Sequence, residues 1–333
     1  MEKKAISLLS GGLDSVLATK LIKDQGIEVV ALHFTSPFCN CNKSSKGNGG
    51  CGLQAVSAAK ELGVRVVVRN KGLEYMEIVR SPLHGYGKNM NPCIDCRIFI
   101  LKKAGELMVE ENASFMITGE VLGQRPMSQT KQAIKLIDKE SGLRDLILRP
   151  LSARHFLPTR PEREGIVNRD RLLDIAGRSR KSQFALADTF NLKEFGCPGG
   201  GCLLTDPLFV PRVRDLLAHS KDFTMKDLSL LRIGRHFRLG SETKLILGRN
   251  KEENDRLVVF ASPPSVRVSP VDFQGPEGLL QGPVNDHIVQ LTANLVAHYV
   301  KHPPSPVTIE LQNGSAVRHT VAYTALDPEL YRL

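Results

Sequence analysis

The pattern of apolar and polar positions divides the chain into two parts of different character. In the first part, apolar runs of strand length alternate with stretches of helical spacing. The apolar runs are residues 5–9, 27–34, 64–68 and 114–120, and the helical stretches are 16–22, 54–62 and 182–190. Single helices between successive strands are typical of a parallel sheet with helices on both faces. We therefore expect an α/β fold with a doubly wound parallel sheet.

Beyond Pro207 the pattern changes to that of a smaller α+β domain. Residues 211–219, 225–231, 251–260 and 285–301 have helical spacing, and residues 236–249 predict a β-hairpin. An Asn-Gly pair within residues 307–315 predicts a second hairpin. The Pro- and Gly-rich residues 263–283 are expected to form a loop. The change of pattern predicts two domains, residues 1–206 and 207–333.

Composition narrows the class of protein. The 333 residues are 41% hydrophobic but only 5% aromatic, with no Trp, so the cores must be aliphatic. Forty-five Lys and Arg against 35 Asp and Glu give a net charge of +10, which favours a polyanionic partner such as nucleic acid. The first residues lead directly into a strand without a secretory h-region, and no apolar run approaches the roughly 18 residues of a membrane span. We expect a cytoplasmic protein with no membrane partner.

The first strand ends in a turn suited to a phosphate. The turn reads Ser10-Gly11-Gly12-Leu13-Asp14-Ser15, and helical spacing follows it directly. A strand, a glycine turn and a helix N-terminus present several backbone N–H groups to one point, and the two serines add hydroxyl donors. Asp14 would repel a bare phosphate, so it suggests a divalent metal that accompanies a nucleotide. An ordinary βα turn is the alternative for the glycine pair alone.

This string resembles the signature of the PP-loop ATP pyrophosphatases, which split ATP into AMP and pyrophosphate. The resemblance implies that Ser10, Gly11, Gly12, Asp14 and Ser15 bind ATP together with Mg²⁺, and that Asp14 is catalytic. His33 and Phe34 end the second strand, where a doubly wound sheet places its ligands, so they are candidates to line an adenine pocket. Ordinary packing at a strand end is equally compatible with these two residues.

A second motif narrows the resemblance to one branch of that superfamily. Residues 118–124 read Thr-Gly-Glu-Val-Leu-Gly-Gln, and Ser128-Gln129 follows. This segment resembles the second nucleotide-contacting segment of the tRNA 4-thiouridine synthetases, which implies contacts to ATP from Gly119 and Gln124. The sequence Arg-Pro-Leu at 149–151 extends the resemblance.

Seven cysteines point to metal or redox chemistry rather than to structural disulfides. Cys93 and Cys96 open a predicted helix, with Asn91 as its cap and Pro92 at its first position. At that place the helix dipole lowers the pKa of a thiol, which suits a metal ligand or a nucleophile. Inert cysteines or a thioredoxin-like dithiol are the alternatives. Cys39, Cys41 and Cys51 lie in a long polar segment and are expected to be exposed or substrate-side thiols.

The glycine-rich stretch 195–205 supplies two more cysteines, Cys197 and Cys202. One of them could join Cys93 and Cys96 in a set of three that holds a [4Fe-4S] cluster with one open iron. We favour Cys202, because Pro198 biases Cys197 to an extended backbone and removes the next N–H donor. A catalytic pair, in which one cysteine carries a persulfide and the other resolves it, is the alternative.

The last third of the chain resembles the RNA-binding domain of the NFACT proteins. The resemblance rests on Gly-Arg-His-Phe-Arg at 234–238 and on Gly-Arg-Asn-x-x-Glu-Asn at 248–254. The basic residues expected to contact RNA are Arg232, Arg235, Arg238 and Arg249.

These resemblances together imply an ATP-dependent tRNA sulfurtransferase of the thiouridine synthase group. Its cofactors would be ATP, Mg²⁺ and a [4Fe-4S] cluster, and its partners tRNA and a sulfur donor, either sulfide or a persulfide carrier. A PP-loop enzyme that thiolates or amidates a small molecule is one alternative. An RNA- or ribosome-associated factor without thiolation activity is another. The modified base, the sulfur donor and the oligomeric state are not indicated by the sequence.

Overall fold

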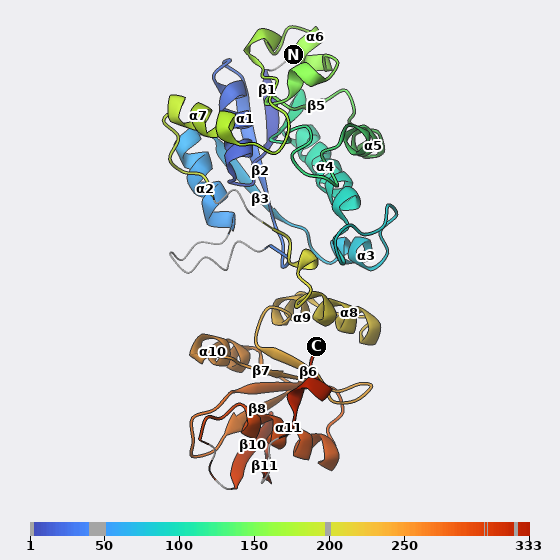
Figure 1. Cartoon of the computed structure of the whole chain (residues 1–333), viewed down its shortest axis with the longest axis vertical. Coiled ribbons are helices and arrows are strands. Elements are labelled where there is room, and N and C mark those ends of the chain that lie inside the picture. Colours follow the sequence, from blue (N-terminus) through green and yellow to red (C-terminus); the bar gives the residue numbers. More distant parts are fainter. Residues whose placement is uncertain (1–2, 40–50, 197–200, 303, 305, 323–325) are drawn as a thin grey trace. The chain divides into compact units, whose positions relative to one another are not determined.

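The computed structural model describes residues 3–39, 51–196, 201–302, 304, 306–322 and 326–333. The chain divides into two compact units, Met1–Asp206 and Pro207–Leu333, and each unit has its own sheet (Figure 1). Two cysteines for which the sequence predicts a role, Cys41 and Cys197, lie outside the described residues.

The first unit is built on a five-stranded sheet. Its strands are β1 (Lys4–Leu8), β2 (Glu28–Thr35), β3 (Arg65–Asn70), β4 (Phe115–Thr118) and β5 (Ile147–Leu148). Its helices are α1 (Leu13–Lys23), α2 (Cys51–Leu62), α3 (Glu74–Arg80), α4 (Cys93–Glu110), α5 (Lys131–Ser141), α6 (Arg160–Arg163) and α7 (Lys181–Thr189), with 3₁₀ turns at Ala153–His155, Arg169–Arg171 and Leu203–Thr205. The strand order is β3-β2-β1-β4-β5, and every pair is parallel. The predicted fold class is confirmed.

Helices cover both faces of this sheet because alternate strand residues point to opposite sides. Ala5 of β1 packs in a core with α1, α2 and α7, whereas its neighbour Ile6 packs in a second core with α4 and α5. Strands buried on both faces read as continuous apolar runs, which is why the sequence marked them clearly. Figure 1 shows α1, α2 and α7 on one side of the sheet and α4 and α5 on the other.

The strand order places a switch point between β1 and β4. From β1 the chain crosses to β2 and β3 on one side, and β4 and β5 lie on the other. In such sheets the ligand crevice lies at the carboxyl ends of the strands where the order reverses. The turn at 10–15 follows β1, and the motif at 118–124 follows β4, so the fold brings both motifs to this crevice.

The second unit has a six-stranded antiparallel sheet. Its strands are β6 (Arg235–Arg238), β7 (Lys244–Leu247), β8 (Val266–Pro270), β9 (Gly278–Gln281), β10 (Val307–Asn313) and β11 (Ala316–Ala322), in the order β11-β10-β8-β9-β7-β6. Its helices are α8 (Val210–His219), α9 (Met225–Leu230), α10 (Lys251–Phe260) and α11 (Asp286–His298), with a 3₁₀ turn at Pro328–Leu330. Both predicted hairpins are confirmed, as β6–β7 and β10–β11.

The prediction of a loop over residues 263–283 is wrong. This stretch contains β8 and β9, which pair with each other and continue the sheet. Val266 and Val268 point into the core on one face, and Leu279 and Leu280 of β9 bury opposite faces. The strands are short and separated by Pro and Gly, so tertiary pairing outweighs their weak local preference.

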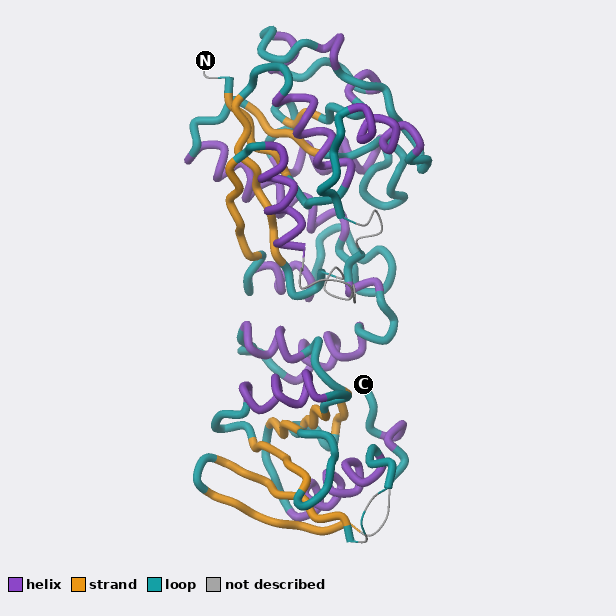
Figure 2. The backbone as a smooth tube through the Cα atoms, turned by 90° about the vertical axis from the view of Figure 1, so that its left-hand side faces the viewer, coloured by secondary structure: helices purple, strands orange, loops and turns teal. Residues whose placement is uncertain are grey.

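The core of the second unit lies mainly between its sheet and α11. A smaller cluster on the other face includes Leu230, Ile246 and Leu257, contributed by α9, β7 and α10. In Figure 2 the strands of each unit lie together with helices packed beside them. None of the helices in the described ranges has the length and apolarity needed to cross a bilayer.

Candidate active site at the carboxyl edge of the parallel sheet

Hydrogen bonds of its own side chains fix the conformation of the turn after β1. The Ser15 hydroxyl donates to the carbonyl of Gly12 at 2.8 Å and lies 3.2 Å from the hydroxyl of Ser10. Gly11 has a φ of +79°, and a Cβ there would lie 2.8 Å from the amide nitrogen of Ala55. Gly12 caps α1 without any side-chain hydrogen bond. The first amides of α1 therefore have no side-chain acceptor and can bind a phosphate.

The motif after β4 packs directly on this turn. A Cβ on Gly119 would lie 2.5 Å from the amide nitrogen of Ser15, so only glycine allows the approach. The Gln124 amide donates to Oδ2 of Asp14 at 2.9 Å. The two predicted nucleotide segments thus form one site.

Two oxygens in this site are buried without a hydrogen-bond partner, namely Oδ1 of Asp14 and Oε1 of Gln124. Burying a carboxylate or amide oxygen unpaired is costly unless a ligand satisfies it. Carboxylate and amide oxygens are the donors that Mg²⁺ prefers. The residues present therefore fit the metal that the sequence implied.

A buried ion-pair network fixes the loop behind Gly119. Glu120 accepts from Arg149 at 3.0 Å and pairs with Arg97 at 3.2 Å, and Arg149 also binds Asp138 at 2.6 Å. Burial opposes the charge on Glu120, but Arg97 and Arg149 outweigh it and lower its pKa. Because Arg97 belongs to α4, the network ties the β4 motif to the helix that carries Cys93 and Cys96.

The start of α4 differs in detail from the prediction. Pro92, not Asn91, occupies the N-cap position, and the Asn91 amide instead donates to Sγ of Cys93 at 2.9 Å. Burial raises the pKa of Cys93.

Cys96 has a cation on its sulfur that sequence reasoning missed. Nζ of Lys71 donates to Sγ of Cys96 at 3.0 Å and lies 4.5 Å from the ring centre of Tyr75. Burial acts to raise the pKa of Cys96, but the Lys71 ammonium and the Tyr75 hydroxyl outweigh it and lower this pKa. Cys96 is therefore the cysteine of this site best prepared to be a thiolate. Lys71 directly follows β3 and so lies at the same sheet edge, and this position was the only feature of the sequence that indicated its contact with the site.

Cys202 joins these two cysteines. Leu203 donates its amide to the carbonyl of Phe38 at 2.7 Å, and Met90 donates to Leu204 at 3.1 Å, so the segment is pinned between β2 and α4. Burial, together with the nearby thiols of Cys96 and Cys93, raises the pKa of Cys202 to about 11. We call Cys93, Cys96 and Cys202 the thiol cluster; all three are free of disulfides.

The thiol cluster supplies three soft donors. No three His, Cys, Asp or Glu side chains within the described ranges are grouped tightly enough for a single metal ion. Cys39 takes part in a disulfide, which corrects the expectation of a free thiol there.

Arg125 interacts electrostatically with both Asp14 of the nucleotide turn and Cys93 of the thiol cluster. Burial and the charges of Arg97 and Arg180 lower the pKa of Arg125, and the opposing effect of Cys93 and Asp14 is smaller. Arg125 follows Gln124 directly in the sequence, so the motif at 118–124 could have indicated that Arg125 belongs to the site. The site therefore combines a phosphate turn, a buried carboxylate, cationic side chains and three thiols.

Two family models match separate parts of the chain. Residues 1–155 match the sequence model of the family "Thiamine biosynthesis protein (ThiI)". The first unit contains a PP-loop domain of the ThiI type. Residues 234–331 match the model "NFACT protein RNA binding domain", so an NFACT-type domain follows the ThiI-type domain in the same chain.

Curated relatives match the ThiI-type domain. The tRNA-specific 2-thiouridylase MnmA of Clostridium acetobutylicum is 29% identical over 141 residues, which are 35% of this chain and 40% of the relative. A probable tRNA sulfurtransferase of Thermococcus kodakarensis is 29% identical over 148 residues, 44% of this chain and 36% of the relative. The chain thus spans about two fifths of the length of these relatives.

A solved 4-thiouridine synthetase–RNA complex with bound ATP also matches, at 19% identity and a TM-score of 0.37. The match covers 68% of this chain and 52% of that one.

His33 lies beside the nucleotide turn of the ThiI-type domain. Its Nδ1 is 3.0 Å from the carbonyl of Leu9, and its buried Nε2 has no partner. A carbonyl only accepts, so Nδ1 carries the proton and Nε2 is an acceptor. Burial lowers the pKa of His33 and keeps it neutral. A contact to adenine from His33 or Phe34 stays a prediction.

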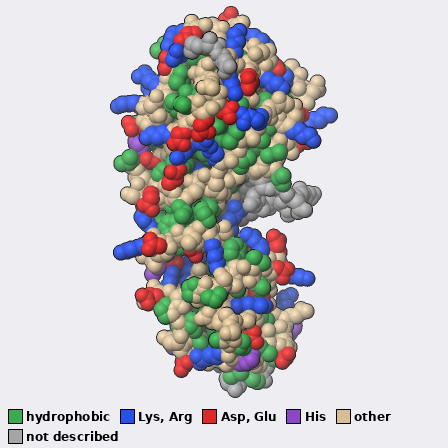
Figure 3. Space-filling view, turned by 180° about the vertical axis from the view of Figure 1, so that it is seen from behind, with side chains coloured by type: hydrophobic (Ala, Val, Ile, Leu, Met, Phe, Trp, Pro, Cys, Tyr) green, Lys and Arg blue, Asp and Glu red, His purple; other side chains and the backbone are tan. Residues whose placement is uncertain are grey.

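The four predicted RNA-binding arginines have different surroundings in the NFACT-type domain. Arg238 is paired with Asp215 at 2.7 Å, and Arg249 is paired with Glu253. Arg235 lies over the Tyr299 ring at 4.3 Å, and burial lowers the pKa of Arg232. On the face seen in Figure 3, basic and acidic side chains are interspersed. A role of these arginines in RNA binding stays a prediction.

Proposed function

We propose that this chain is an ATP-dependent tRNA sulfurtransferase, which adenylates a base carbonyl oxygen of tRNA and replaces that oxygen with sulfur. The observation that carries the proposal is that the nucleotide turn and the thiol cluster share one sheet edge, where Arg125 interacts electrostatically with both Asp14 and Cys93. The named activities of the MnmA and sulfurtransferase relatives support the same chemistry.

In the first half-reaction the base carbonyl oxygen attacks the α-phosphorus of ATP, and pyrophosphate leaves. The amides of the turn at 10–15 and the N-terminus of α1 would bind the pyrophosphate portion. Asp14, oriented by Gln124, would hold Mg²⁺ against it. Arg125 would offset the negative charge that develops at the α-phosphate. The target base must leave its stack to reach this point.

In the second half-reaction sulfur attacks the activated carbon, the C–S bond forms, the C–O bond breaks, and AMP leaves. A [4Fe-4S] cluster held by Cys93, Cys96 and Cys202 would supply an open iron for the incoming sulfide. Lys71 and Tyr75 would hold the sulfur of Cys96 in its charged form. The persulfide alternative uses the same thiols without iron and is also compatible with the Lys71 contact.

The NFACT-type domain would supply the affinity for tRNA. Its family description and the net charge of +10 support a nucleic-acid partner. Sulfide or a persulfide carrier would deliver the sulfur, and the reaction would take place in the cytoplasm.

The test is an anaerobic reaction of the purified chain with ATP, Mg²⁺, sulfide and unmodified tRNA. AMP and a thiolated nucleoside, measured by chromatography and mass spectrometry, should form together and only with tRNA present. AMP formation that depends on a small molecule but not on tRNA would favour the small-molecule alternative. RNA binding with no AMP under any condition would favour a binding factor. Iron and acid-labile sulfide in the same sample distinguish the cluster from the persulfide pair.

A further inference from the structure

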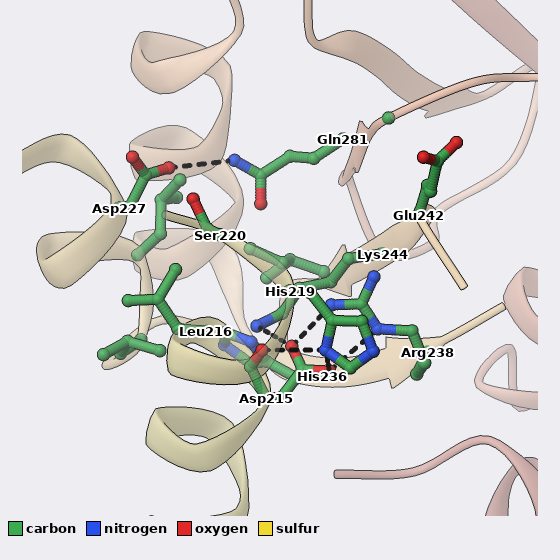
Figure 4. A pocket seen from close by; sticks show the side chains of 14 residues that line it. Asp215, Leu216, His219, Ser220, Asp227, His236, Arg238, Glu242, Lys244 and Gln281 are labelled. Atoms are coloured by element: carbon green, nitrogen blue, oxygen red, sulfur yellow. Dashed lines mark hydrogen bonds and ion pairs between the residues drawn. The ribbon is translucent and has the colours of Figure 1, made fainter. Parts of the chain in front are cut away.

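A cavity in the second unit is not part of the site described above. It has a volume of 180 Å³ and lies between helices α8 and α9 and strands β6, β7 and β9 (Figure 4). Asp215, His219 and Asp227 come from the helical side, and His236, Arg238 and Lys244 come from the strands. The helices precede residue 234, where the NFACT match begins, so half of this wall lies outside the matched stretch.

The cavity wall has more hydrogen-bond donors than acceptors for them. Arg238 uses Nε and one terminal nitrogen on Asp215, at 2.8 and 2.7 Å, and leaves the other terminal nitrogen unused. Lys244 is buried and gives a single hydrogen bond, to Oδ2 of Asp215 at 2.9 Å. Two cations thus share one carboxylate, and Figure 4 shows the three side chains converging. Arg238 is partly exposed, but Lys244 is buried and has to share its carboxylate, so an anionic ligand suits this wall.

The other two carboxylates of the lining do not compensate these cations. Asp227 accepts from the amide and hydroxyl of Thr224 and from the side chain of Gln281. Glu242 is exposed at the rim. Burial lowers the pKa of Lys244 despite the opposing effect of Asp215, so the ammonium gains stability from a second anion.

His236 adds an acceptor without a partner to the lining of this cavity. The ring is 1% exposed; its Nε2 lies 2.9 Å from the carbonyl of Ile233, and its Nδ1 has no partner. Because the carbonyl can only accept, Nε2 carries the proton and Nδ1 presents a lone pair. Burial and the charges of Lys244 and Arg212 lower the pKa of His236 well below its usual value, which keeps Nδ1 an acceptor.

We propose that this cavity binds one ribonucleotide of an RNA strand, with its phosphate on Lys244 and Arg238 and its 2′-hydroxyl donating to Nδ1 of His236. The phosphate supplies negative oxygens for the excess donors. The hydroxyl supplies the donor that Nδ1 lacks, and it is the group that distinguishes RNA from DNA. The proposal rests on the proposed function only in taking RNA as the partner.

Protein variants test the phosphate contact in the full chain. Binding of a labelled 12-nucleotide single-stranded RNA is measured by fluorescence anisotropy at fixed salt. Arg238→Gln and Lys244→Met should each weaken binding about tenfold. Arg318→Gln removes the same charge from an exposed pair with Asp286 on the same unit and should change affinity less than twofold. Equal effects of Arg238→Gln and Arg318→Gln would overturn the proposal.

Changes to the ligand test the hydroxyl and do not depend on how a variant folds. DNA of the same sequence should bind about tenfold more weakly than RNA, and His236→Phe should abolish that difference. Uridine monophosphate should displace the RNA, whereas inorganic phosphate at equal concentration should not. Equal displacement by phosphate would reduce the cavity to a simple anion site, and equal binding of DNA would exclude the hydroxyl contact.

The outcome is separable from that of the proposed function. Thiolation with RNA binding that is insensitive to Arg238→Gln would refute the cavity proposal alone. Ribonucleotide binding without AMP formation would refute the sulfurtransferase alone.

Discussion

Replacing Gly119 by alanine tests whether the two nucleotide motifs work as one packed unit. A Cβ at this position would lie 2.5 Å from the amide nitrogen of Ser15 and 2.6 Å from the carbonyl carbon of Asp14. Ordinary contacts begin at 3.4 Å, so the first turn of α1 must retreat by about 0.9 Å. The neighbours are backbone atoms, which cannot rotate away as a side chain can.

The expected loss follows from this displacement. A shift of about 1 Å in a positioned group can cost about 100-fold in rate, whereas overpacking costs about 1–3 kcal/mol of stability. We therefore expect Gly119→Ala to remain folded at 25 °C while its tRNA-dependent AMP formation falls about 100-fold. The assay is single-turnover AMP release with radiolabelled ATP, together with urea unfolding of the same sample.

Gly52→Ala is the matched control, because a Cβ at Gly52 in α2 meets nothing within 4 Å. Its AMP formation should equal that of the wild type. Wild-type turnover in Gly119→Ala would refute the packing argument. A global loss of structure in that variant would show instead that the contact serves folding rather than the position of the turn.

Three further predictions concern single groups. Asp14→Ala should abolish AMP formation with the fold intact, whereas Asp24→Ala, at the far end of the same helix, should not; AMP release from Asp14→Ala would contradict the proposed metal contact. Alanine at each member of the thiol cluster should remove iron and thiolation together, whereas Cys197→Ala should keep its iron. Iron and sulfide are measured on all four variants. If Cys202→Ala keeps its iron and Cys197→Ala loses it, Cys197 rather than Cys202 is the third ligand. Asp215→Asn should destabilise the chain by about 3 kcal/mol at pH 7, since it leaves two cations unpaired. Although burial opposes its charge, Arg238 and Lys244 lower the pKa of Asp215. The stability it contributes is therefore present above its unfolded pKa and lost as pH falls through the lower folded value, so the difference from wild type in urea unfolding should shrink as the pH is lowered through that range.

The parallel sheet and its ligand edge could be predicted because the relevant signals are local. Strands buried on both faces are continuous apolar runs, and glycine turns directly follow β1 and β4. Once the sheet is parallel, the carboxyl ends must share an edge, so the meeting of Asp14 with Gln124 follows from topology.

Other parts depend on contacts between residues far apart in the chain. Lys71 reaches Cys96 across 25 positions, and only its place directly after β3, at the same sheet edge, indicates the contact. Asn91 has the composition of a helix cap but donates to a sulfur instead. The strands β8 and β9 are stabilised by partners on both sides rather than by their own propensity.

The placement of α8 and α9 has a consequence for how the two modules can be exchanged between proteins. The matched stretches end at residue 155 and resume at 234, whereas the second compact unit begins at Pro207. Asp215 on α8 pairs with Arg238 and Lys244 of the sheet, so an excision at 234 would leave the buried Lys244 and the partly exposed Arg238 without their carboxylate. A chimaera that receives this C-terminal module should therefore be joined at 207, with both helices carried along as part of the transplanted piece.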